Sequence, residues 1–115
     1  MLTVFGRFLR RWHGTSVGPI QAAKDAGRRV FKVPVDIRVS LEEHGVVFLH
    51  IGKGTVLRAN ATGRRIMELL LEQRELGDIA QQMSTEYSLP FTQIERDVQA
   101  FVDSLQANGL VTVEN

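Results

Sequence analysis

Residues 52–71 read G-K-G-T-V-L-R-A-N-A-T-G-R-R-I-M-E-L-L-L and join a β half of the chain to an α half. The G-K-G sequence at 52–54 predicts a tight turn, because glycine supplies the positive φ that such turns need. Residues 55–59 then predict a short strand that begins with two β-branched side chains. Asn60 or Thr62 is expected to cap the following helix, since a short oxygen-bearing side chain accepts a bond from a free amide at a helix start. The stretch therefore predicts a turn, a strand and a capped helix.

Two further strands are predicted upstream of this stretch. Residues 35–41, V-D-I-R-V-S-L, alternate apolar and polar side chains, which is the period of a half-buried strand. A turn at 42–45 leads to residues 46–51, which are apolar almost throughout, as expected for a strand covered on both faces. Together with 55–59, these segments predict a three-stranded antiparallel β-meander with short connections.

Three helices are predicted downstream from apolar periodicity and capping signals. The first covers about 61–73, and the second is expected to begin with Asp78 as its cap. The third is expected to begin at Thr92, with Glu95 three residues on completing a capping box. Gly109 is expected to end it in the left-handed conformation. The predicted fold class is α+β, a meander followed by a three-helix winged helix-turn-helix-like bundle.

The charge of the chain divides at Pro34. Residues 1–34 hold seven basic residues and one acidic residue, a formal charge of +6, whereas 35–115 hold seven basic and twelve acidic residues, a charge of −5. We interpret 1–34 as a basic N-terminal extension and 35–115 as one small domain that folds alone, because the strand and helix signals lie beyond Pro34. Residues 110–113 are expected to finish it as a short strand or an extended tail.

The extension contains one amphipathic segment. Residues 2–12 place apolar side chains along one side of a helix and three arginines largely on the other. Residues 13–19 contain glycine, serine and proline and are typical of a linker. Three interpretations of 2–12 stay open: a tail that packs on its own domain or is disordered, which is favoured, a docking helix for a partner protein, or a helix on an anionic membrane surface.

The composition favours a soluble cytoplasmic protein. The chain has no cysteine, which excludes a disulfide framework and a thiolate nucleophile. No apolar run approaches the roughly 20 residues needed to span a bilayer. Arginines interrupt the apolar N-terminus, so it lacks the core of a signal peptide.

Three segments in a fixed order resemble the PqqD family. They are V-V-F-L-H-I-G-K-G-T-V-L-R-A-N-A-T-G-R-R-I-M-E-L-L at 46–70, D-I-A-Q-Q-M-S-T-E-Y at 78–87, and I-E-R-D-V-Q-A-F-V-D-S-L-Q-A-N-G-L-V at 94–111. Members of this family, also called RiPP recognition elements, present precursor peptides to the enzymes that modify them. The resemblance covers about 35–115 and does not extend to 1–34.

The resemblance implies where a peptide binds. In the family, the leader segment of the precursor adds as a strand beside the third strand and lies against the third helix, so that backbone hydrogen bonds give affinity and side-chain pockets give selectivity. Val56 and Phe101 are explained equally well as core residues. The implied peptide-binding residues are Thr55, Val56, Leu57, Arg58, Ala59, Asp97, Phe101 and Ser104.

The chain shows no pattern of residues that predicts an enzyme. His13, His44 and His50 are far apart in sequence and lack the spacing of metal ligands, and His50 in an apolar strand is better explained as a structural histidine. No cofactor, catalytic residue or metal site is predicted. The resemblance therefore implies a non-catalytic chaperone for a leader peptide, which it presents to a modifying enzyme such as a radical SAM protein.

Two other functions remain as alternatives: a winged-helix module that binds another protein, and a DNA-binding regulator. Phosphate contacts dominate DNA affinity, and the third predicted helix carries more acidic than basic residues, so nucleic acid is not expected as a partner. A homodimer is a further expectation, since a strand edge without a peptide can pair with its own copy.

Overall fold

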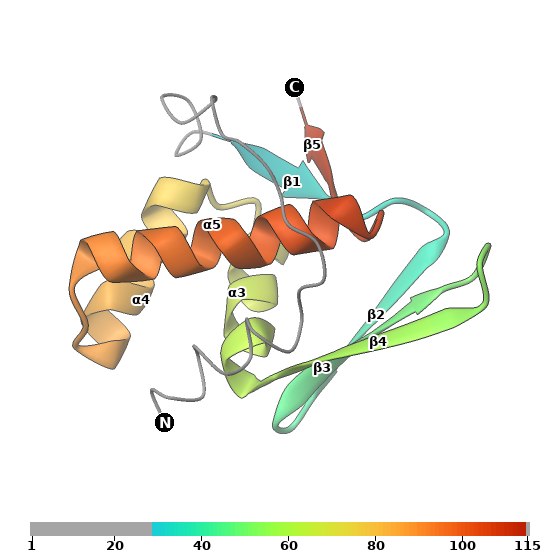
Figure 1. Ribbon diagram of the computed structural model, residues 1–115, viewed down its shortest axis with the longest axis horizontal. Coiled ribbons are helices and arrows are strands. Elements are labelled where there is room, and N and C mark those ends of the chain that lie inside the picture. Colours follow the sequence, from blue (N-terminus) through green and yellow to red (C-terminus); the bar gives the residue numbers. More distant parts are fainter. Residues whose placement is uncertain (1–28, 115) are drawn as a thin grey trace.

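The computed structural model describes residues 29–114. In this part of the chain, a three-stranded sheet lies beside three helices, and a two-stranded sheet lies near the C-terminal end of the last helix (Figure 1). The predicted helix at 2–12 and the predicted linker at 13–19 lie outside the described residues. The α+β fold class is confirmed.

The predicted meander is present. Strands β2 (Ile37–Glu42), β3 (Gly45–His50) and β4 (Thr55–Asn60) pair antiparallel in the order β2-β3-β4. The turn between β3 and β4 contains Gly54 at φ +65°, a conformation that side chains with a Cβ adopt rarely. The turn chemistry therefore explains where the third strand begins.

Only one face of this sheet is covered, so the expectation that β3 is buried on both faces is wrong. Val46 and Phe48 point inward and are buried, whereas Leu49 is 38% exposed on the other face. Leu49 lies opposite Val56 of β4, which is 53% exposed. The three helices lie to one side of the sheet, which leaves these two side chains uncovered (Figure 1).

Helices α3 (Ala61–Leu71), α4 (Leu76–Tyr87) and α5 (Phe91–Ala107) form the α half. Figure 1 shows α5 crossing in front of α3 and α4, and α4 packs against α5. The apolar stripe of each helix supplies the core, as the periodicity predicts. The largest fully buried side chains are Phe31, Phe48, Phe101, Ile66, Met67, Leu69, Ile79, Met83, Ile94, Leu105, Leu110 and Val46.

Two of the predicted helix signals are confirmed. The Asn60 side chain accepts hydrogen bonds from the backbone amides of Thr62 and Gly63, each at 3.1 Å, and so caps α3. Such a cap contributes about 1 kcal/mol. At the other end of the bundle, Gly109 follows α5 at φ +73°, in the left-handed conformation expected of a helix stop.

Two predicted caps are wrong. Helix α4 begins two residues before Asp78, because Leu76 is buried in the core and its amide bonds the carbonyl of Arg29. Helix α5 begins at Phe91, directly after Pro90, so Thr92 lies inside the first turn, where its side chain caps nothing. In both cases tertiary burial or the fixed φ of proline sets the helix start instead of the nearest polar side chain.

A short antiparallel pair joins the two ends of the described chain. Strand β1 (Val30–Lys32) pairs with β5 (Thr112–Glu114), with Phe31 opposite Val113. Phe31 is only 2% exposed and belongs to the core. This strand lies on the N-terminal side of Pro34, within the segment assigned above to the extension, so the structure adds a core residue to that segment.

Charged side chains link α3 to α4. Arg65 donates two hydrogen bonds to the carboxylate of Glu86, at 3.0 and 2.6 Å, and a third to Glu68 at 3.0 Å. Gln82 donates to the same Glu86 carboxylate at 2.9 Å. The hydrogen bonds from Arg65 are the main reason that the pKa of Glu86 lies below its ordinary value.

This network predicts a loss of stability in acid. The pKa of Glu86 is lower in the folded than in the unfolded chain, so its contribution is present above about pH 4.5 and is lost as the pH falls through the folded value. We expect Glu86→Gln to lower the free energy of unfolding by about 1 kcal/mol near pH 7, because the pair is partly exposed. Urea unfolding at about pH 7 and about pH 2.5 measures this, with the exposed Glu95→Gln as control. A Glu86→Gln difference of equal size at both pH values contradicts the assignment.

Candidate functional site

Strand β4 is one edge of the three-stranded sheet, with β3 on one side. Among residues 29–114, no strand pairs with its other side. An unpaired strand presents a row of backbone donors and acceptors that can pair with another chain. The five predicted site residues at 55–59 all lie on this strand.

The register decides which backbone groups of β4 are free. A Cβ added to Gly45 would lie 2.4 Å from the carbonyl oxygen of Ala59, so that carbonyl points toward β3. Successive residues of an antiparallel strand direct their backbone groups to opposite sides, so Leu57 also bonds β3. The amides and carbonyls of Val56 and Arg58 therefore face away from β3 and form the free edge.

The side chains of β4 alternate in the opposite sense between the two faces of the sheet. Leu57 and Ala59 lie on the helix-covered face and pack partly against the core. Val56 and Arg58 are exposed on the other face, where Arg58 lies opposite Val47. A chain added along this edge meets an apolar surface on one face and an exposed arginine on the other.

Gly45 is a positioning residue that the sequence analysis missed. Its hydrogen lies where any larger side chain would collide with the backbone of Ala59. The close approach of β3 and β4 at this point therefore requires glycine. The only sequence signal was a glycine directly after the turn, which was assigned to the turn itself.

Helix α5 supplies the other three predicted site residues. Asp97, Phe101 and Ser104 are spaced by four and three residues, so they lie along one side of the helix. Phe101 is 0% exposed, and Ser104 is 8% exposed, with its backbone carbonyl accepting from the Asn108 side chain at 2.8 Å. Phe101 thus lies in the core, and of the three only Asp97 offers a polar group that is partly open to solvent.

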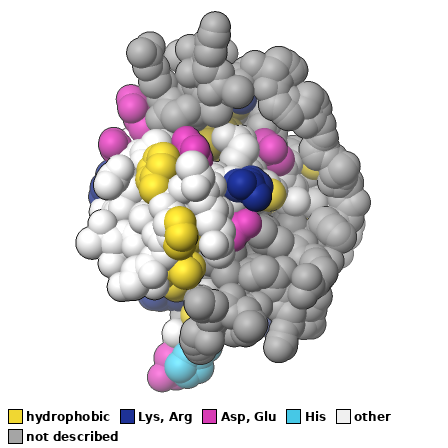
Figure 2. Space-filling model, turned by 60° about the vertical axis from the view of Figure 1, so that its left-hand side comes forward, with side chains coloured by type: hydrophobic (Ala, Val, Ile, Leu, Met, Phe, Trp, Pro, Cys, Tyr) yellow, Lys and Arg dark blue, Asp and Glu magenta, His cyan; other side chains and the backbone are white. Residues whose placement is uncertain are grey.

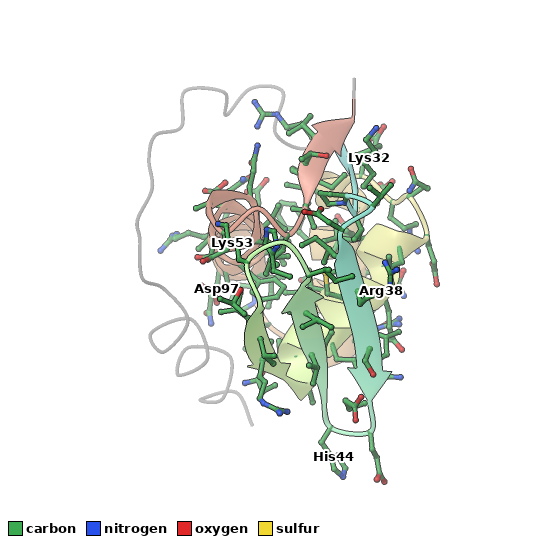
Figure 3. The ribbon with its side chains drawn as sticks, turned by 90° about the vertical axis from the view of Figure 1, so that its right-hand side faces the viewer. Lys32, Arg38, His44, Lys53 and Asp97 are labelled. Carbon is green, nitrogen blue, oxygen red and sulfur yellow. The ribbon has the colours of Figure 1, made fainter. Side chains whose placement is uncertain are left out.

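Asp97 projects from α5 on the side of the molecule where β4 lies (Figure 3). Partial burial raises the pKa of this carboxyl above its ordinary value, and the neighbouring Arg96 opposes that shift. Burial dominates because it removes water from the charged form. Figure 3 shows Lys53, in the turn before β4, on the same side of the sheet, and Arg38 on the β2 side.

His50 has a structural environment. Its side chain is buried, the backbone amide of Lys53 approaches its Nδ1 at 3.4 Å, and a carboxylate oxygen of Asp36 lies 3.9 Å from the same nitrogen. The histidine thereby connects β3 to the turn that precedes β4, as expected for a structural histidine. Within residues 29–114, no group of three or more histidine, cysteine, aspartate or glutamate residues is placed to hold a metal ion.

The described surface carries charges of both signs. On the face drawn in Figure 2, acidic and basic side chains stand among separate apolar ones, without an extended basic area over the described atoms. The third helix carries Glu95, Asp97 and Asp103 against Arg96. None of the helices within residues 29–114 has the length and apolar character needed to cross a membrane.

Known proteins resemble this arrangement. A family model described as "Coenzyme PQQ synthesis protein D (PqqD)" matches residues 45–111, which is more than half of the chain. A solved structure titled "Lasso peptide synthetase B1 complexed with the leader peptide" is 33% identical, with a TM-score of 0.67 over 71% of this chain and 96% of that one. Another, titled "TbiB1 in Complex with the TbiA(beta) Leader Peptide", is 30% identical, with a TM-score of 0.66 over 70% and 93% of the two chains. No curated protein matches the chain. The family match covers β3, β4 and all three helices, and the chain belongs to the PqqD family.

Proposed function

We propose that this protein binds the leader segment of a ribosomally made precursor peptide as an additional strand along β4. The observation that carries the proposal is the free β4 edge, where the backbone groups of Val56 and Arg58 face away from β3. Strand addition satisfies these groups through main-chain hydrogen bonds, and neighbouring side chains select the sequence. Membership of the PqqD family and the leader-peptide titles of two solved relatives support this use of the edge.

The proposed peptide-binding residues have different parts. Alternate side chains of an added strand face the helix-covered side, beside Leu57 and Ala59, and the open side, beside Val56 and Arg58. Asp97 borders the helix-covered side from α5. Phe101 and Ser104 act from beneath, by fixing the position of α5 against the sheet. Thr55 begins the edge.

We propose that the protein does not carry out the modification itself and delivers the peptide to a separate enzyme. The groups around the edge are backbone donors and acceptors, one carboxylate and one guanidinium, which suit recognition. Radical SAM proteins are one class of enzyme that the family resemblance implies, and the titles of the solved relatives add peptide synthetases as a second class. A native pull-down of the full-length protein followed by mass spectrometry identifies which class is bound.

A homodimer is a second use of the same backbone groups. Two β4 edges that pair with each other satisfy the donors that a leader would otherwise occupy. Peptide binding and dimerisation are then mutually exclusive, so saturating leader is expected to convert a dimer to a monomer in size-exclusion chromatography with light scattering.

The binding test uses the full-length protein and a fluorescein-labelled leader peptide from the precursor encoded beside its gene. We expect a Kd of about 10 µM or tighter for the leader and at least tenfold weaker binding of a scrambled leader of the same composition. Equal binding of the two peptides, or no binding of either, contradicts the proposal. Tight, steeply salt-dependent binding of duplex DNA would instead support the regulator alternative.

A further inference from the structure

Asp97 differs from the other partly buried acids of the described chain. Three acidic side chains in residues 29–114 are partly buried: Glu68, Asp97 and Asp103. Glu68 accepts from Arg64 and Arg65, and Asp103 accepts from Gln99 at 2.9 Å. Asp97 forms neither a hydrogen bond nor a salt bridge with any described residue.

A partly desolvated carboxylate without a donor is unfavourable, because it has given up some of its water without a replacement. The free energy is recovered when a donor arrives, and a cationic donor recovers most, since charge-assisted hydrogen bonds are roughly twice as strong as neutral ones. Asp97 therefore carries an unmet requirement that a ligand can satisfy.

The position of Asp97 identifies the ligand. It lies on the side of α5 that faces β4, one and two helical turns from the buried Phe101 and Ser104. A strand added to β4 directs every second side chain to this face of the sheet. A long side chain from one such position can reach the carboxylate while its backbone stays bonded to β4.

We propose that Asp97 is a specificity-determining residue that selects a lysine or arginine in the leader peptide, at a position whose side chain faces α5. This inference rests on the proposed function, because it requires the peptide to lie along β4. It assigns the leader a chemical class: a strand-forming segment with a basic side chain on the α5 side. Lysine and arginine combine the necessary charge with a stem long enough to cross from the added strand to the helix.

The test measures binding of the labelled leader to full-length variants by fluorescence polarisation. Asp97→Asn keeps the size of the side chain and an acceptor oxygen but removes the charge, and we expect it to weaken binding about tenfold, or about 1.4 kcal/mol. The matched control is Asp103→Asn, which removes a carboxylate on another side of the same helix and is expected to leave Kd unchanged. Circular dichroism confirms that both variants are folded.

Leader variants then identify the partner. Each lysine and arginine of the leader is replaced by glutamine, and one replacement is expected to weaken binding to the wild type about tenfold and binding to Asp97→Asn hardly at all. The reversed pair, Asp97→Lys with glutamate at that leader position, is expected to regain most of the lost affinity.

Three outcomes overturn the inference. Unchanged affinity in Asp97→Asn removes Asp97 from the contact. A loss that is shared by every leader variant shows that no basic residue is coupled to it, and a loss that does not shrink as salt rises indicates a neutral donor. If the wild type fails to bind any leader, the proposed function fails, and this inference fails with it.

Discussion

Val56→Pro is expected to abolish leader binding and leave the fold intact, whereas Leu57→Pro is expected to unfold the sheet. Proline removes a backbone donor and fills its place with a ring. At Val56 the lost amide faces away from β3, so the sheet keeps its ladder, while an added strand loses a hydrogen bond and meets the ring. We expect at least a 30-fold rise in Kd, equivalent to about 2 kcal/mol.

Leu57 is the matched position one residue on, where the amide bonds β3 and the side chain packs against the core. Loss of that bond leaves a buried acceptor on β3 without its donor. Val56→Thr, which keeps the amide and the β-branched shape, is the control for the side chain and is expected to bind nearly as well as the wild type. Fluorescence polarisation gives the affinity, and circular dichroism with thermal melting gives the fold. A folded Val56→Pro variant with wild-type affinity contradicts strand addition at β4.

Phe31→Ala is expected to lower the free energy of unfolding by about 3–5 kcal/mol, as for other fully buried phenylalanines. The side chain is enclosed by the core, and its strand pairs with β5 at the far end of the described chain. For a domain of this size, that loss corresponds to a fall in Tm of roughly 15 °C or more. Urea unfolding of the full-length variant measures the effect, with the exposed neighbour Lys32→Ala as control.

The same reasoning bears on the boundary predicted at Pro34. A fragment of residues 35–115 lacks Phe31, so it is expected to be less stable than the full chain by about the same amount. A fragment of residues 29–115 retains Phe31 and the β1–β5 pair and is expected to keep most of the stability. Equal stability of the two fragments would contradict the contribution assigned to Phe31 and restore the boundary at Pro34.

Local signals predicted much of the fold from the sequence. The glycines of the turn, the alternation at 35–41 and the Asn60 cap each act within a few residues, so the strands and the start of α3 could be predicted from them. Asp78 and Thr92 were wrong as caps because burial of Leu76 and the fixed φ of Pro90 decide those helix starts. Short strand β1 was missed because its partner lies some 80 residues away in sequence.

The site was less predictable than the fold. Periodicity places Phe101 and Ser104 on the same side of α5 as Asp97 but gives no depth, and only tertiary packing shows that the first two are buried. The outward direction of the Val56 and Arg58 backbone groups depends on the register with β3, to which Gly45 is the structural guide. The absence of a described hydrogen-bond partner for Asp97 likewise follows from its neighbours in space and has no sequence signal.

The most direct test of strand addition is amide hydrogen exchange, followed by NMR on the full-length protein with and without saturating leader peptide. In the free protein, the amides of Leu57 and Ala59 are expected to be protected by β3, and those of Val56 and Arg58 to exchange quickly. With leader bound, the exchange of Val56 and Arg58 is expected to slow by at least about tenfold, because the added strand accepts their hydrogen bonds. If the leader binds while these two amides keep the exchange rates of the free protein, the peptide occupies another surface, and the assignment of β4 as the docking edge is wrong.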